Sequence, residues 1–170
     1  ALVKQPCLWR SGFYYTLSVG LFSGVVTNSW LLQEPLEVRL GIVAVMIIMC
    51  GTALAMYGFL LHGILETFGA LAGDAKGLSC LLGYTTLPFL VLTPGALLAG
   101  KMGFDGIFLL AGVTLVGCLW MLYLLVRSLE VVYIIDFTRA AATVLFSLLL
   151  LYIVLVLPWQ VGLNLLLRHF

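Results

Sequence analysis

Two titratable side chains, His62 and Glu66, stand four residues apart at the end of a long apolar stretch. Residues at this spacing share one face of a helix, so the imidazole and the carboxylate can meet there. Ionisable groups near a membrane are costly and often functional, and this pair could bind a partner, a lipid or a proton. It could equally be a structural pair at the interface, where water reaches Glu66. Two groups are too few to hold a metal ion, and His169 lies at the far terminus, so we expect no metal site.

Four further charged residues form two pairs with a spacing of three, Arg127 with Glu130 and Asp136 with Arg139. They flank an apolar run at 131–135. One interpretation is a solvated loop whose local ion pairs contribute little. The other is an edge on which a cytosolic partner docks.

Catalytic motifs are not found. The sequence has no H-E-x-x-H, G-x-S-x-G, P-loop or G-x-G-x-x-G pattern. We therefore predict a protein that is not an enzyme and uses no cofactor. A net charge of +1 gives no basic field for nucleic acid. The cysteines have neither zinc nor disulfide-framework spacing, and we expect them to be packing residues: Cys7, Cys50, Cys80 and Cys118.

Hydrophobic residues make up 64% of the 170 residues and charged residues only 9%, too few to cover a water-soluble surface. Five stretches contain no Asp, Glu, Lys or Arg, and each exceeds the roughly 20 residues of helix that cross a bilayer core. The chain begins with Ala and shows no signal-peptide pattern, so we expect the first stretch to be retained. The sequence predicts an all-α, polytopic membrane bundle in one domain, 1–170, with short connections and spans at about 11–33, 40–65, 77–100, 106–126 and 140–167.

Orientation and anchoring follow from the span ends. A cytoplasmic N-terminus puts five basic residues on the cytoplasmic side and three on the other, which favours that orientation: Lys4, Arg10, Lys76, Arg127 and Arg139 against Arg39, Lys101 and Arg168. Amphipathic rings prefer the membrane interface, and four aromatic residues fall near span ends: Trp9, Trp30, Tyr133 and Trp159. Trp120 lies deeper, and we expect it to pack against another helix.

The third span is interrupted by Gly83, Pro88 and Pro94. Each proline removes a backbone donor and clashes with the preceding turn, so two kinks are expected. Ser and Thr hydroxyls or neighbouring helices could satisfy the freed carbonyls; alternatively, a discontinuous helix could line a substrate site. We expect this segment to be central in the bundle, with Tyr84 directed inward to a polar partner.

Several short motifs occur in order at 61–66, 71–77, 83–88, 120–130 and 138–140. They comprise a late histidine in the second helix, a Gly/Lys-rich connection containing Lys76, a Gly-Tyr-x-x-x-Pro opening of the third helix, and the run from the fourth helix into the fifth. In these motifs the chain resembles the Yip family of Ypt/Rab-interacting proteins and their bacterial relatives. The resemblance implies five membrane helices and a cytoplasmic N-terminus.

Eukaryotic Yip proteins bind prenylated small GTPases and act in vesicle traffic, and they carry a long hydrophilic N-terminal region with an Asp-Leu-Tyr-Gly-Pro-like motif. The present sequence has neither, which argues against binding a small GTPase. It looks closer to the bacterial or organellar branch, so we expect a bacterial inner membrane or an organellar membrane. The predicted function is a non-catalytic scaffold or accessory subunit whose partners are membrane lipids and other membrane proteins of a larger complex. The alternative is a small transporter or channel component that uses the broken third helix and His62/Glu66.

Overall fold

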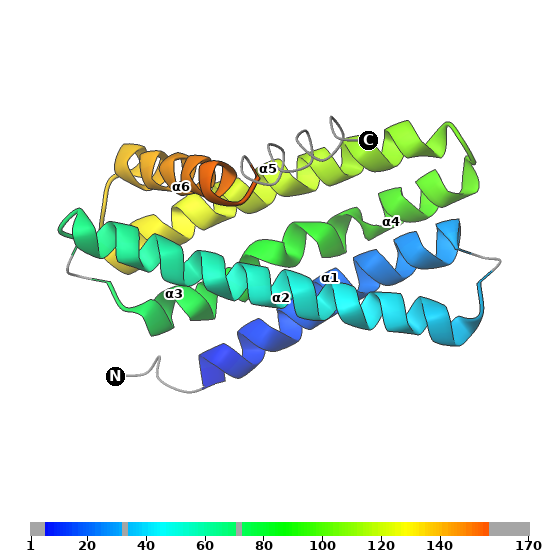
Figure 1. Ribbon diagram of the computed structural model, residues 1–170, viewed down its shortest axis with the longest axis horizontal. Coiled ribbons are helices and arrows are strands. Elements are labelled where there is room, and N and C mark those ends of the chain that lie inside the picture. Colours follow the sequence, from blue (N-terminus) through cyan, green and yellow to red (C-terminus); the bar gives the residue numbers. More distant parts are fainter. Residues whose placement is uncertain (1–5, 32–33, 71–72, 157–170) are drawn as a thin grey trace, which may run out of the picture.

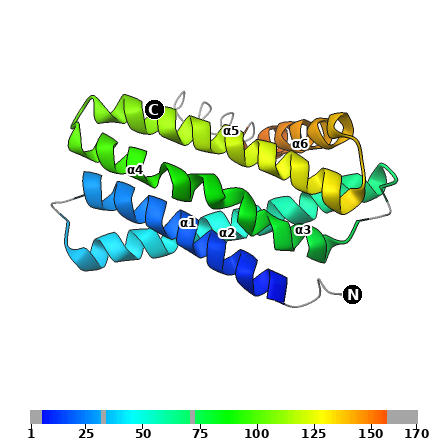
Figure 2. The same ribbon diagram turned by 180° about the vertical axis from the view of Figure 1, so that it is seen from behind.

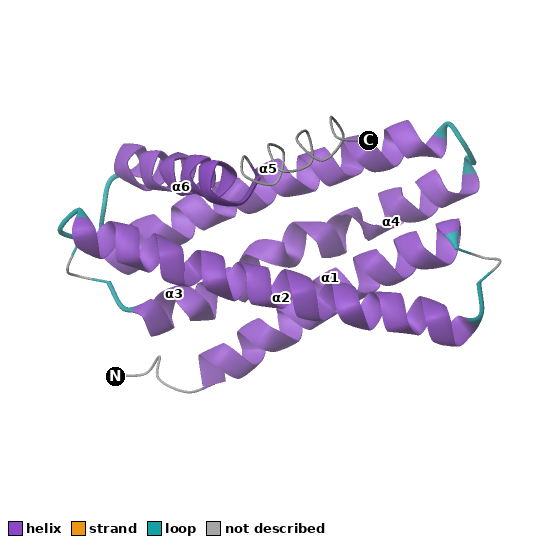
Figure 3. Cartoon of the chain, viewed as in Figure 1, coloured by secondary structure: helices purple, strands orange, loops and turns teal. Residues whose placement is uncertain are grey.

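The computed structural model describes residues 6–31, 34–70 and 73–156, and these are helical apart from short connections (Figure 3). The short η1 is a 3₁₀-helix and the terminal η2 is a π-helix. The elements in chain order are α1 Pro6–Trp30, α2 Leu36–Thr67, α3 Ala75–Leu82, η1 Gly83–Thr86, α4 Leu87–Lys101, α5 Gly106–Tyr133, α6 Phe137–Leu151 and η2 Tyr152–Val156.

Four stretches of helix are long and apolar enough to cross a membrane. In hydrocarbon the backbone must satisfy its own hydrogen bonds, which a helix does within one segment. The predicted fold class, an all-α membrane bundle, is therefore confirmed. The four stretches are Leu36–Thr67, Ala75–Lys101, Gly106–Tyr133 and Phe137–Val154.

The first helix, α1, is not among those four, although its 25 residues are enough to span. Its inward face carries hydroxyls where the other helices carry aliphatic side chains, and this lowers its hydropathy. Each buried hydroxyl is hydrogen-bonded or lies against the neighbouring helices: α1 packs on α2, α3, η1 and α4. The buried hydroxyl residues of α1 are Ser11, Ser18, Ser23 and Thr27.

The helices run along one long axis, and their connections gather at two ends (Figures 1 and 2). The start of α1, the α2–α3 connection and the α5–α6 connection lie at one end, which we call the N-terminal end. The α1–α2 and α4–α5 connections lie at the other. The first turn of α3, which carries Lys76, and the first turn of α6, which carries Arg139, thus share one end of the molecule.

The first two helices, α1 and α2, are each displaced by a few residues from the predicted spans 11–33 and 40–65, and the largest difference is at the end of α5. The helix α5, which corresponds to the predicted span 106–126, continues through Arg127 and Glu130 to Tyr133, so the expected 127–139 loop is reduced to a short turn. Ile134 ends the helix in a left-handed conformation, φ 53°. The final part of the last predicted span, 157–167, lies outside the described residues, as do Lys4, Trp159, Arg168, His169 and the side chain of Cys7.

The largest buried cluster lies near the N-terminal end, where α2, α3, α5 and α6 meet. Tyr133 is its largest member and is only 1% exposed. The interfacial position predicted for Tyr133 is therefore wrong. Trp120 shows the reverse: it is 41% exposed on the outside of α5, so its expected packing against another helix is also wrong. The cluster consists of Leu61, Leu65, Leu78, Leu82, Leu125, Val126, Leu129, Tyr133, Ala140 and Val144.

Candidate functional site

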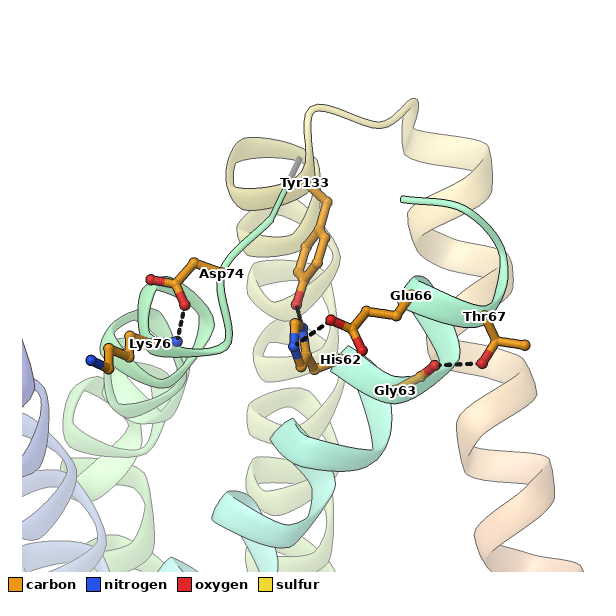
Figure 4. A network of polar contacts seen from close by, with 7 residues as sticks. All are labelled: His62, Gly63, Glu66, Thr67, Asp74, Lys76 and Tyr133. Atoms are coloured by element: carbon orange, nitrogen blue, oxygen red, sulfur yellow. Dashed lines mark hydrogen bonds and ion pairs between the residues drawn. The ribbon is translucent and has the colours of Figure 1, made fainter. Parts of the chain in front are cut away.

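The best-connected polar group of the N-terminal end is centred on His62 (Figure 4). His62 is half-buried in the last turns of α2, and its Nδ1 lies 2.5 Å from the hydroxyl of Tyr133 on α5. On the other side, its Nε2 lies 3.2 Å from Oε1 of Glu66, one turn further along α2. The structure thus brings His62 and Glu66 together, as the spacing predicts, and adds Tyr133 as a third member.

The two contacts of the imidazole define a consistent set of donors and acceptors. An ionised Glu66 can only accept, so Nε2–H donates to it. In a neutral imidazole Nδ1 then accepts from the Tyr133 hydroxyl, and the histidine is satisfied on both sides. The same geometry suits a buried tyrosine, whose hydroxyl needs a partner. This arrangement ties α2 to α5 through one side chain.

A close approach of backbone holds the Tyr133 ring from its other side. A Cβ atom on Gly73 would lie 2.0 Å from Cδ1 of that ring, so only glycine fits here. Directly after it, Asp74 caps α3 by accepting a hydrogen bond of 3.1 Å from the amide of Lys76. The Lys76 side chain is exposed. The Gly/Lys-rich connection therefore packs on the tyrosine and starts the third segment.

Beside this cluster, a groove of about 800 Å³ separates the end of α2 from the start of α6. Most of its lining residues are of apolar types, although polar atoms also face the groove, and the rings of Phe68 and Phe146 meet edge to face at 6.2 Å between centroids. Arg139 provides a charge at the wall. The lining residues are Leu65, Phe68, Gly69, Ala70, Tyr133, Ile134, Ile135, Arg139, Ala142, Thr143 and Phe146.

The two predicted charge pairs behave differently. Arg127 donates to Glu130 at 2.8 Å on the same helix and lies over the rings of Tyr123 and Phe137. Asp136 and Arg139 are both exposed, and no ion pair joins them in the described structure. Arg127 is thus held in place by its own surroundings, whereas Arg139 lines the groove.

The third segment is broken by a side chain from another helix. Ser11 of α1 is buried, and its hydroxyl accepts a hydrogen bond of 3.1 Å from the Gly83 amide and donates one of 3.3 Å to the Ser79 carbonyl. In a regular α-helix these two backbone groups bond each other directly. A side chain inserted into that ladder is a recognised cause of a kink. Gly83 permits the approach, because a Cβ there would lie 2.3 Å from the Ser11 carbonyl oxygen.

The prolines play a smaller part than predicted. Pro88 is buried at the start of α4, where an amide would have no partner within the helix, so it begins a helix rather than kinking one. Only Pro94 lies inside α4. Hydroxyls satisfy carbonyls at the break, as one of the two interpretations expected: Thr85 donates to Leu82 and Thr86 to Gly83, both at 2.7 Å.

Tyr84 does not have the expected polar partner. It is half-buried, and its ring meets that of Tyr14 on α1 at 5.2 Å between centroids. None of the described residues hydrogen-bonds its hydroxyl. The segment as a whole is central, because α3, η1 and α4 pack against α1 and α5. Three carbonyls at the break, those of Ser79, Leu82 and Gly83, thus accept hydrogen bonds from hydroxyls within the fold.

Sequence reasoning missed Tyr133 and Ser11, the two partners that define these contacts. Both lie far along the chain from the groups they bind, and neither belongs to a motif. A buried hydroxyl in α1 could have been suspected from the regular spacing of Ser and Thr in that helix, but its partner could not. Within residues 6–31, 34–70 and 73–156, no three His, Cys, Asp or Glu side chains form a potential metal site.

Long apolar helices with charged groups gathered at their ends define an integral, all-helical membrane protein. The model of the Yip1 domain matches residues 1–157, and the chain belongs to this family. The match confirms the resemblance that the motifs around His62, Gly83 and Arg127 indicate. No curated protein and no solved structure matches the chain in the same comparisons.

Proposed function

We propose that the chain is a non-catalytic membrane scaffold or accessory subunit, and that it binds other membrane proteins through the outer face of α2. The most apolar part of α2 has a mean hydropathy of 2.2, yet no residue in it is fully buried in the fold. Small residues that are exposed at the surface of the chain recur along α2. They are Gly41, Ala44, Thr52, Ala55 and Gly63.

The glycines of α2 differ in what surrounds them, and this difference supports the proposal most directly. Gly51 and Gly58 face inward, and a Cβ would meet Tyr15 at 3.2 Å or Leu82 at 2.4 Å. Gly41 and Gly63 face outward with nothing within 4 Å of such an atom. Packing inside this chain accounts for the first pair only. In lipid, small residues let the backbones of two helices approach closely, which supports a partner helix on the outer face.

The charge distribution supports an orientation for this scaffold. Four basic residues lie towards the N-terminal end, against Arg39 and Lys101 at the other. We propose that the N-terminal end faces the cytoplasm, because Lys and Arg favour that side. The basic residues of this end are Arg10, Lys76, Arg127 and Arg139.

The test compares complexes extracted from native membranes in mild detergent. We expect the wild-type chain to migrate in a complex larger than its own mass. The double variant Ala44→Phe with Ala55→Phe should release it, because two large rings hold a partner helix away. Ala111→Phe, at an exposed alanine on α5, is the matched control and should leave the complex intact.

Two outcomes would count against the proposal. A wild-type chain that migrates alone from native membranes has no stable partner. A complex that survives the double variant is held elsewhere. Charge reversal of Arg127 together with Arg139 would then test whether the N-terminal end holds it.

A further inference from the structure

A second cavity, of about 530 Å³, lies beside the middle of α2 and is distinct from the groove at the N-terminal end. Its wall is formed by residues of α1, α2, η1, α4, α5 and α6. Its lining consists of Tyr15, Val19, Phe22, Ser23, Val26, Met46, Cys50, Ala53, Leu54, Tyr57, Thr86, Phe89, Met121, Leu122, Leu148 and Leu151. We call it the mid-bundle chamber.

The polar atoms in this wall are already engaged. Tyr15 donates to the Ile47 carbonyl at 2.6 Å, and the Tyr57 hydroxyl is 2.7 Å from that of Ser147. Ser23 donates to Val19, and Thr86 to Gly83. The chamber therefore presents ring faces, methyl groups and thioethers. A buried water needs two to four polar partners, so a ligand here must be apolar.

The chamber opens sideways. Among its lining residues, Met46, Cys50 and Ala53 on α2 and Leu148 on α6 are exposed at the surface of the chain. The opening therefore lies between α2 and α6, within the part of α2 that is apolar enough to cross a membrane. At that depth the surrounding solvent is lipid hydrocarbon.

We propose that the mid-bundle chamber binds one fatty-acyl chain of a membrane phospholipid. Its volume lies in the range of small-molecule sites, about 300–1,000 Å³. An empty apolar chamber would forfeit the dispersion contacts of its whole lining. The described wall contains no charged residue that could bind a headgroup, so the site recognises the acyl chain and the headgroup stays outside. The bound chain completes the packing between α2 and α6.

The experiment uses the full chain in phospholipid nanodiscs that contain a phospholipid with a photoactivatable diazirine in the middle of one acyl chain. After irradiation, adducts are mapped by peptide mass spectrometry. We expect a saturable adduct on chamber residues such as Val19 and Met121. Unlabelled phospholipids with the same acyl chains should compete equally well with a zwitterionic or an anionic headgroup.

Ala53→Trp fills the opening and should lower chamber adducts about tenfold, the change that about 1.4 kcal/mol of binding free energy gives. Ala111→Trp on the exposed face of α5 is the matched control and should leave them unchanged. If Ala53→Trp does not fold, Ala53→Leu replaces it, and the wild-type map needs no variant.

Three results would overturn the proposal. The first is equal labelling of exposed α5 residues such as Leu115 and Leu119, which marks ordinary bilayer contact. The second is unchanged chamber labelling in a folded variant at Ala53. The third is a lack of lipid adducts together with crosslinks from Cys50, carrying a photoreactive group, to a peptide of this chain, which would show that protein fills the chamber. None of these depends on a partner helix at the outer face of α2.

Discussion

The hydroxyl of Ser11 lies between the amide of Gly83 and the carbonyl of Ser79, at 3.1 Å and 3.3 Å. One backbone hydrogen bond of the third segment is thus replaced by two hydrogen bonds to a side chain of α1. The contact locks α1 to the segment at the point where α3 changes into η1. It explains why the helix breaks before Pro88 and not at it.

Ser11→Ala should destabilise the fold by about 1–2 kcal/mol, because the buried Gly83 amide loses this acceptor. The free energy of unfolding can be measured by titration with SDS in mixed micelles. Thr16→Ala is the control, since the exposed Thr16 hydroxyl bonds only the Gly12 carbonyl of its own helix. Equal effects of the two variants would mean that the inserted hydroxyl has no special role.

Gly83→Ala should destabilise more than Ser11→Ala. The added methyl would lie 2.2 Å from Ser11 Oγ and 2.3 Å from the Ser11 carbonyl oxygen, and backbone cannot move aside cheaply. We expect a loss of about 2–3 kcal/mol or failure to fold. Gly12→Ala has open space and should be neutral or stabilising by up to about 1 kcal/mol. A thermal melt in detergent compares them; a Gly83 variant as stable as the Gly12 variant would contradict the close approach.

Tyr133 and His62 should be energetically coupled. Tyr133→Phe removes the hydroxyl that meets Nδ1, and His62→Ala removes the ring, so the double variant should lose less than the sum of the two. We expect a coupling of about 0.5–3 kcal/mol in a double-mutant cycle. Tyr123→Phe, on the exposed part of the same helix, serves as the uncoupled control. If the stability losses of the two single variants simply add in the double variant, Tyr133 and His62 do not interact energetically despite their short distance.

Tyr84→Phe should change stability by less than about 0.5 kcal/mol, because no described partner bonds its hydroxyl and the ring contact with Tyr14 remains. Tyr84→Ala should lose that contact and cost more, about 1 kcal/mol or above. Chemical denaturation of both variants separates the ring from the hydroxyl. A large loss in the phenylalanine variant would restore the polar role that the sequence predicts.

The topology can be tested with single cysteines in the connections, on a background that lacks the native ones. Substitutions at Asp74 and Asp136 should react with a membrane-impermeant maleimide from the cytoplasmic side. Those at Glu34 and Gly103 should react only from the opposite side, since the two sets lie at opposite ends of the bundle. Labelling of all four from one side would refute a spanning bundle.

Much of the fold could be predicted from charge alone, because long uncharged stretches in a chain so poor in charge must be helices in lipid. The pairing of His62 with Glu66 is a local matter of helix spacing, and it is confirmed. Tyr133 shows the limit of such reasoning. Its position near a span end suits an interfacial anchor, but only the packed core determines that it turns inward. Likewise, the two prolines are visible in the sequence, whereas the hydroxyl that opens the helix comes from a residue 72 positions away.

The hydroxyl-rich face of α1 has a consequence for biogenesis. A helix with this many serines and threonines partitions weakly from the translocon into bilayer, whereas α2, with a mean hydropathy of 2.2, partitions strongly. Because only residues 31–35 separate the two helices, we expect them to leave the translocon and enter the membrane together as a hairpin. During synthesis, α2 would then cover one side of the hydroxyl-bearing helix α1 before α4 is made and covers the other side.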